Sequence, residues 1–415
     1  MTGTLGERPR EPLKSALCRA LGERAVPREK LPEPLIFKIN MAFEILKKSK
    51  ISRARLGKLK TLHGEIATPC FMPVATRGAV KNLTPKELKE IGAEIILSNT
   101  YHLLLQPGLQ VIKKAGGLHK FINWPHPILT DSGGYQVFSL SKSRKITDKG
   151  VEFRSEIDGN KIFLSPEKSL EFQKEIGSDI CMVLDECPSY SLNKKIIEKA
   201  VKRSTVWAQR SKEFFEKKYK SKKRPLIFGI IQGGVFKDLR EKSLKEILNL
   251  NFDGLAIGGL MVGEPTSKTF EILKFLSPLL PEKTPHYLMG AGFPEQIVKA
   301  VQLGIDMADC VIPTRHARHG ELFVFKKDVR KFPEKILEKK FYKIIKISKA
   351  KYKSNLEPPD KDCSCYTCQN FSLAFLHHLY KTKEPLYQRL ATLHNLKFYF
   401  DLIKILRDGI KKGKI

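Results

Sequence analysis

Short apolar, β-branched runs recur along the chain, and most are followed by small or polar residues and then by an amphipathic stretch. Runs of this kind predict strands, and the stretches between them predict helices. We expect eight strands, at Phe71–Ala75, Ile95–Ser98, Ile128–Thr130, Ile180–Leu184, Leu226–Ile231, Gly254–Ile257, His286–Met289 and Ala308–Ile312. The expected helices are Pro85–Ile91, Pro166–Ile176, Asn193–Lys218, Leu239–Leu248, Lys268–Leu276 and Pro294–Gln302.

Strands that alternate with helices predict an α/β fold with a parallel sheet, and eight such strands can close into a TIM-type (β/α)8 barrel. The alternative is an open doubly wound sheet, but no Gly-x-Gly-x-x-Gly fingerprint follows the first strand. Residues 141–161 interrupt the alternation, and Asp158-Gly159 within them predicts a hairpin. We therefore expect a barrel with a small antiparallel sheet inserted near its mouth.

The length of 415 residues fits one large barrel with an appendage. Residues 1–40 are rich in Arg, Glu and Pro, and we expect a disordered extension or sequence upstream of a start at Met41. An organellar presequence is the weaker alternative, because such segments are poor in acids. The expected domains are the extension 1–40, a catalytic barrel at 41–325, and a Lys-rich, zinc-binding helical subdomain at 326–415.

The formal net charge is +31, from 75 basic and 44 acidic side chains. Such an excess favours a polyanionic partner, first nucleic acid and then an anionic membrane, although a general Lys bias would also produce it. The basic residues cluster: 326–353 holds 12 Lys and Arg against three acids. No apolar run approaches the roughly 18 to 20 residues that span a bilayer, so we expect a cytoplasmic protein without a membrane partner.

Three of the eight cysteines are bunched as Cys363-x-Cys365-x2-Cys368. Without a secretory signal, this spacing favours a metal site over disulfides. Three thiolates and one imidazole make a closed, tetrahedral, structural Zn²⁺ site. Spacing alone does not decide which downstream histidine, His377, His378 or His394, is the fourth ligand.

Polar and glycine-rich residues gather where the expected strands end. In a barrel these positions meet at the mouth, where catalytic groups lie. They are 98–102, 131–136, 185–187, 232–234, 258–260, 290–292 and Asp309. Asp309 is an acid within an apolar strand that Pro313 ends, and Arg315 and Arg318 follow in a basic turn suited to a phosphate-bearing ligand. Alternatively, Asp309 caps the strand and the arginines are solvated.

Taken together, these motifs resemble the bacterial-type tRNA-guanine transglycosylases over about residues 43–410. The resemblance rests on long matching stretches and on the cysteine signature. They are Asn99-Thr100-Tyr101-His102-Leu103, residues 129–138, Asp185-Glu186-Cys187, residues 229–234, residues 258–264 and Ala308-Asp309-Cys310-Val311.

The resemblance implies exchange of the wobble guanine of G-U-N anticodons for a 7-deazaguanine base through a covalent RNA–enzyme ester. Asp309 matches the nucleophile and Asp131 the general acid/base. The implied base-binding residues are Asp185, Gln232, the backbone of Gly259 and Leu260, Tyr135 and Met289 on the two ring faces, and Asn99 near the ribose. Arg315 and Arg318 match contacts to the tRNA anticodon loop, and His394 matches the fourth zinc ligand.

Cys187 and Val262 match the type that inserts 7-aminomethyl-7-deazaguanine, and the resemblance also implies a homodimer. The chain departs from the pattern at Met261, at His316 and His319, and between Gly320 and Cys363. The main alternative is a non-catalytic tRNA-binding subunit of a queuine-inserting heterodimer. Such subunits lose catalytic acids, whereas Asp131, Asp185 and Asp309 are present here.

Overall fold

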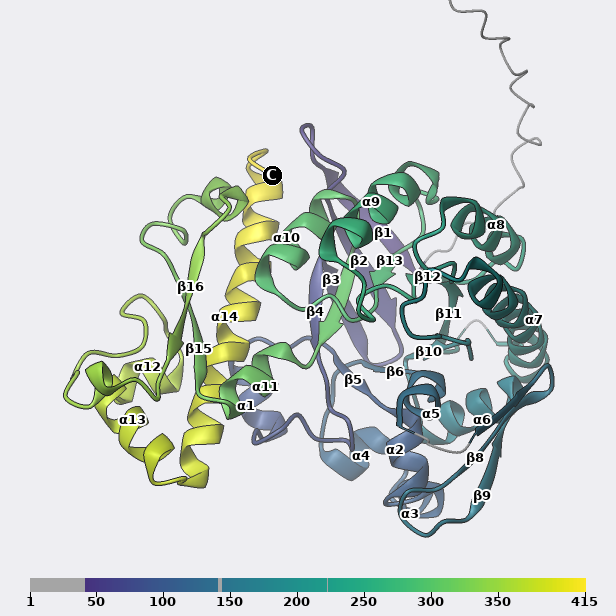
Figure 1. Cartoon of the computed structure of the whole chain (residues 1–415), viewed down its shortest axis with the longest axis horizontal. Coiled ribbons are helices and arrows are strands. Elements are labelled where there is room, and N and C mark those ends of the chain that lie inside the picture. Colours follow the sequence, from purple (N-terminus) through teal and green to yellow (C-terminus); the bar gives the residue numbers. More distant parts are fainter. Residues whose placement is uncertain (1–41, 141–143, 222) are drawn as a thin grey trace, which may run out of the picture. The chain divides into compact units, whose positions relative to one another are not determined.

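The computed structural model describes residues 42–140, 144–221 and 223–415, so the expected extension 1–40 lies outside the described residues. Eight parallel strands form one sheet, in the order β4-β14-β13-β12-β11-β10-β6-β5. Val74 bridges Leu97 between the two end strands, which closes the ring and confirms the predicted barrel (Figure 1). The strands are β4 (Cys70–Pro73), β5 (Ile96–Ser98), β6 (Ile128–Thr130), β10 (Ile180–Met182), β11 (Leu226–Ile231), β12 (Gly254–Ile257), β13 (His286–Leu288) and β14 (Met307–Cys310).

The predicted last strand is wrong at its end. β14 stops at Cys310, and helix α11 (Ile312–Arg318) replaces the expected basic turn. Pro313 lies in the first turn of this helix, where no backbone N–H is needed for an intrahelical bond. The proline that was predicted to end the strand therefore lies at the beginning of a helix. β10 is likewise shorter than predicted and ends at Met182.

The predicted helices are confirmed to within a few residues. Side-chain caps define several starts: Thr84 and Glu87 form a capping box, and Ser165 and Asn193 accept from backbone N–H groups. These helices are α1 (Pro85–Glu90), α6 (Pro166–Ile176), α7 (Lys194–Lys218), α8 (Lys237–Leu248), α9 (Thr266–Leu276) and α10 (Pro294–Gln302). Short helices that the periodicity did not show are α2 (Thr100–Leu105), α3 (Leu109–Lys114), α4 (Leu118–Ile122) and α5 (Gly134–Leu140).

The inserted antiparallel sheet is confirmed as β7 (Arg144–Thr147), β8 (Gly150–Arg154) and β9 (Lys161–Leu164), although residues 141–143 of the predicted segment lie outside the described residues. A second sheet was not predicted: β1 (Phe43–Lys48), β2 (Arg55–Thr61) and β3 (Gly64–Thr68). Its Leu59 and Ile66 are buried in the barrel core. Because Arg55 pairs with Asp306 before β14, this sheet covers the end at which the barrel strands begin.

The C-terminal part packs on the barrel through the long helix α14 (Pro385–Lys411). Tyr399 donates to Gly292 O at 2.6 Å, and Arg407 pairs with Glu94 at 2.7 Å. The other elements are β15 (Glu321–Phe325), β16 (Tyr342–Lys346), α12 (Tyr366–Asn370), α13 (Leu373–Lys381) and the 3-10 helices η1 (Ser277–Leu279), η2 (Pro333–Leu337) and η3 (Ala350–Tyr352). β15 pairs with β16 across the predicted domain boundary at residue 325, so that division stays a prediction. None of the described helices could cross a membrane.

Candidate functional site

The two predicted catalytic carboxylates and the predicted base-binding carboxylate lie at the mouth of the barrel. Asp131 directly follows β6, Asp185 follows β10, and Asp309 lies in β14. Burial raises the pKa of the Tyr287 phenol, and the negative charges of Asp309 and Asp131 raise it further. Asp131 in turn raises the pKa of Asp185. All three acids therefore lie at or just beyond the carboxyl ends of strands of one barrel, and their roles stay predictions.

Asp309 is held by two donors. The Tyr287 hydroxyl donates to its Oδ1 at 2.6 Å, and the Gly290 N–H donates to the same oxygen at 2.9 Å. Burial raises the pKa of Asp309 above its ordinary value, and these two hydrogen bonds oppose the rise. The carboxyl group is thus fixed in one orientation on a rigid strand.

The carboxylate of Asp131 meets the N-terminus of helix α2, where the first backbone N–H groups have no partner within the helix. This carboxylate accepts from Asn99 Nδ2, from Thr100 N at 2.8 Å and from Gly133 N at 3.1 Å. Burial nevertheless raises its pKa to about 6, because desolvation outweighs these bonds. A carboxyl group with such a pKa can both give and take a proton near neutral pH.

Asp185 and Gln232 form a hydrogen-bonded pair, with Gln232 Nε2 donating to Asp185 Oδ2 at 2.6 Å. Burial raises the pKa of Asp185 to about 7. Gly259 packs directly against the amide: its φ is +62°, and a Cβ there would lie 2.2 Å from Gln232 Oε1. Only glycine fits this position, so the backbone of residues 258–260 borders the Asp185–Gln232 pair.

The remaining predicted ligand contacts differ in exposure. Tyr135 is 50% exposed at the start of α5, and Met289 is half-buried just after β13. Leu260 is buried. Arg315 is exposed on α11, whereas Arg318 is half-buried and donates to Thr314 O at 2.9 Å. Their roles toward a ligand stay predictions.

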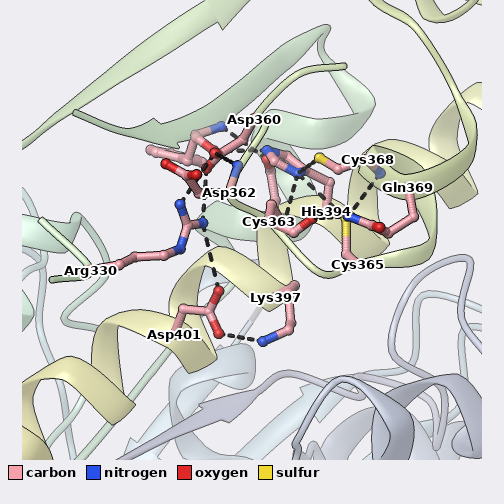
Figure 2. A network of polar contacts seen from close by, with 12 residues as sticks. Arg330, Asp360, Asp362, Cys363, Cys365, Cys368, Gln369, His394, Lys397 and Asp401 are labelled. Carbon is pink, nitrogen blue, oxygen red and sulfur yellow. Dashed lines mark hydrogen bonds and ion pairs between the residues drawn. The ribbon is translucent and has the colours of Figure 1, made fainter. Parts of the chain in front are cut away.

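Cys363, Cys365, Cys368 and His394 form a candidate metal centre, with ligand atoms within 4.8 Å of one another (Figure 2). All four residues are buried, and three sulfurs with one imidazole nitrogen are a donor set that suits Zn²⁺. His394 Nε2 bonds Phe323 O at 2.8 Å, which leaves Nδ1 for the metal. His377 instead bonds Ile347 O, and His378 is exposed, so the structure selects His394.

Neighbouring side chains hold the loop that carries these cysteines. Gln369 Nε2 donates to Cys363 O at 2.8 Å. Asp360, three residues before Cys363, pairs with Arg330 at 2.8 Å, and Arg330 also lies 3.7 Å from Asp401 on α14 (Figure 2). The Lys-rich stretch therefore supplies a structural arginine to the metal centre.

A second group, His63, His119 and Asp179, also brings ligand atoms within 4.8 Å of one another. Here both Asp179 oxygens are already saturated. Oδ1 accepts from His63 N and Nδ1, at 2.9 Å each, and Oδ2 bonds His119 Nε2 at 3.0 Å and Ile128 N at 2.8 Å. The group ties the β2–β3 turn and α4 to the start of β10, and hydrogen bonds account for it.

Sequence reasoning missed two residues at the mouth. Tyr287 was read as part of an apolar strand, although a buried tyrosine hydroxyl usually finds a partner, which is Asp309 here. Arg240 lies in a predicted helix and was given no role. Its guanidinium is buried and bonds four backbone carbonyls around the Gln232 and Gly259 loops. The glycine pairs on both loops were the only signal in the sequence.

Comparison with known proteins agrees with this geometry. The family model described as queuine tRNA-ribosyltransferase matches residues 49–415. The queuine tRNA-ribosyltransferase of Thermodesulfovibrio yellowstonii is 52% identical over 376 residues, which cover 90% of this chain and 92% of the relative. Those of Dictyoglomus turgidum and Desulforamulus reducens are each 48% identical over 90% of this chain, covering 92% and 95% of the relatives. The chain belongs to the queuine tRNA-ribosyltransferase family.

Proposed function

We propose that this protein is a tRNA-guanine transglycosylase that replaces the wobble guanine of G-U-N anticodons by double displacement. The observation that carries the proposal is the convergence of Asp131, Asp185 and Asp309 from three barrel strands, with different donors holding each carboxylate. Family membership supports tRNA as the macromolecular substrate. The reaction is a pentosyl transfer that forms part of queuosine biosynthesis.

In the first displacement, an Asp309 oxygen attacks C1′ of the ribose, and the bond from C1′ to the guanine N9 breaks. The bond's electron pair leaves with guanine, which takes a proton from the Asp131 carboxyl group. In the second displacement, Asp131 removes a proton from the incoming base, whose nitrogen attacks C1′ and releases Asp309. Splitting one displacement into two lowers each barrier and retains the anomeric configuration.

Asp185 and Gln232 read the base. A carboxylate accepts from the ring N–H and the exocyclic amino group of a guanine edge, and an amide N–H donates to O6. The Gln232 amide carries two N–H groups, so one can stay on Asp185 while the other meets O6. Gly259 and Leu260 supply backbone contacts, Tyr135 and Met289 cover the ring faces, and Asn99 lies by the ribose.

The incoming base is 7-aminomethyl-7-deazaguanine. Val262 lines a small pocket with Tyr190, Gln232 and Gly259, and Cys187 is buried beside Gly259. This restricted space favours a compact 7-substituent over a bulky cyclopentenediol. Competition between the aminomethyl base and queuine for labelled-guanine exchange tests this choice, and equal inhibition by both would refute it.

The remaining assignments rest on the same site. Arg315 and Arg318 on α11 contact the anticodon loop, whose flipped-out bases are accessible to side chains. The metal is one structural Zn²⁺ in a C-terminal subdomain, measurable by elemental analysis. The protein acts in the cytoplasm as a homodimer, which sedimentation tests. None of the described cysteines forms a disulfide, in keeping with a reducing compartment.

Incorporation of labelled guanine into a tRNA with a G-U-N anticodon tests the proposal. We expect label in that tRNA and none in a transcript whose wobble guanine is replaced by adenine. A folded, zinc-loaded protein that incorporates no guanine would refute the proposal in favour of the non-catalytic subunit. No structural observation supports that alternative, because all three acids are present and oriented.

A further inference from the structure

Arg240 is a buried cation that the proposed mechanism does not use. It lies in the first turns of α8 and is fully buried, and burial lowers its pKa to about 9. The position near a helix N-terminus adds an unfavourable dipole interaction. Among the described residues no carboxylate lies within ion-pair distance of it. An arginine held under these conditions needs strong compensating contacts.

Backbone carbonyls from two separate loops provide the compensation. Nε donates to Gly234 O at 2.8 Å, and Nη1 donates to Ile231 O at 2.8 Å. On the other loop, Nη1 donates to Gly258 O at 2.7 Å and Nη2 to Gly259 O at 3.1 Å. The planar guanidinium therefore connects the loop after β11, which carries Gln232, with the loop after β12.

The hydrogen bonds from Arg240 to Gly258 O and Gly259 O also fix the direction of the N–H groups in the same peptide units. In a planar trans peptide the C=O and the following N–H point in opposite directions. With Gly258 O and Gly259 O both directed at Arg240, the N–H groups of Gly259 and Leu260 must point away from it.

The same helix also holds Gln232 itself. The Ser243 hydroxyl, one turn after Arg240, accepts from Gln232 N at 3.0 Å. A Cβ on Gly233 would lie 2.7 Å from Arg240 N, so the loop touches the helix backbone directly. Helix α8 thus holds the backbone of Gln232 through Ser243 and the loop of Gly258 and Gly259 through Arg240.

We propose that Arg240 is the positioning residue of the base pocket, aligning the Gln232 amide and the Gly259 and Leu260 backbone for a purine base. This inference rests on the proposed function. Lysine cannot replace arginine in this role, because a compact ammonium with three donors does not match a planar fork across two loops. Replacing Arg240 with lysine should therefore weaken base binding more than tRNA binding.

Arg240→Lys tests the inference, with Arg224→Lys as the matched control. Arg224 joins the starts of the same two strands, pairing with Asp253 at 2.9 Å at the opposite end of the barrel. In the full-length, zinc-loaded protein, we expect Arg240→Lys to raise KM for guanine about tenfold or more while KM for tRNA changes less than about twofold. Arg224→Lys should leave both KM values within about twofold.

An unchanged guanine KM in Arg240→Lys would overturn the inference, as would equal rises in both KM values. If that variant does not fold, Ser243→Ala replaces it, with an expected rise of about threefold in guanine KM alone. An unchanged guanine KM in Ser243→Ala would then overturn the inference. A native protein that exchanges no guanine would instead refute the proposed function, so the two failures are distinguishable.

Discussion

The hydroxyl of Tyr287 donates a 2.6 Å hydrogen bond to Oδ1 of Asp309 from the neighbouring strand of the barrel. This bond lowers the pKa of a carboxyl group that burial raises. It also orients the oxygen atoms at a rigid strand end, as an in-line displacement at an anomeric carbon requires. The proposed nucleophile thus depends on a tyrosine that reads in the sequence as a core residue.

Tyr287→Phe should lower the exchange rate about 10- to 100-fold, because a hydrogen bond to a charged group is lost without a change of shape. The pKa of Asp309 should rise, since the bond that opposes desolvation is absent. The acid limb of the pH–rate profile should therefore move to higher pH. A profile that keeps the native acid limb would show that Tyr287 does not tune Asp309.

Asn99→Ala should shift the ionisation of Asp131 in the same direction. Asn99 donates to the Asp131 carboxylate and opposes the burial that sets its pKa to about 6. Without this donor, the ionisation near pH 6 in kcat/KM should move upward, toward about 7. Substitution of Asn160, which is exposed in the turn between β8 and β9, serves as a control and should leave the profile unchanged.

Asp185→Asn should stabilise the protein at pH 8 while it impairs guanine exchange. The folded pKa of Asp185 is about 7, above its ordinary value, so its contribution to stability is full at low pH and is lost as pH rises through 7. The neutral variant avoids this loss, so its free energy of unfolding at pH 8 should be about 1–3 kcal/mol higher than that of the native protein. Chemical denaturation at pH 8 and pH 5 measures the difference, which should shrink at pH 5. A destabilised variant at pH 8 would contradict the account.

Asp179→Asn should have the opposite effect. Burial tends to raise the pKa of Asp179, but hydrogen bonds from His119, Ile128 and His63 bring it below its ordinary value. Stability from a depressed pKa is present above the unfolded-state pKa and is lost as pH falls through the folded value. The free energy of unfolding of the variant should therefore be about 2–4 kcal/mol lower than that of the native protein at pH 7, and the difference should be smaller near pH 3. Equal stability at pH 7 would show that the cluster is not structural.

The sequence predicted the barrel and its acids because both follow from local patterns. Apolar strand runs are visible in single segments, and the (β/α)8 topology then brings Asp131, Asp185 and Asp309 to one end. Contacts between distant segments were beyond such patterns. Nothing near Arg240 shows that its guanidinium meets carbonyls of two loops, and Pro313 fits both a strand end and a helix start.

The N-terminal sheet and the fourth metal ligand illustrate the same limit. β1 exposes most of its length, and the buried positions of β2 are Arg55, Gly57 and Leu59, so burial in these strands does not follow an apolar alternation in the sequence. Spacing left three histidines open, and the resemblance alone singled out His394. The structure selects it because α14 carries this ring against Phe323 O and the three cysteine sulfurs.

Removal of the metal should destabilise the C-terminal part of the protein. With Zn²⁺ absent, Cys363, Cys365 and Cys368 become buried thiols without their shared ligand. We expect His394→Ala to lose the bound Zn²⁺ and to lower the melting temperature by at least several degrees. His377→Ala is the control for a buried histidine outside the centre and should retain one Zn²⁺ per chain.

Trapping the covalent intermediate tests the central claim that Asp309 is the nucleophile. The native protein and Asp309→Asn are mixed with a labelled G-U-N tRNA, denatured and separated by electrophoresis. The account predicts a denaturant-resistant RNA adduct with the native protein, which free guanine reverses, and no adduct with Asp309→Asn. An adduct of equal yield in the variant would contradict the assignment of Asp309.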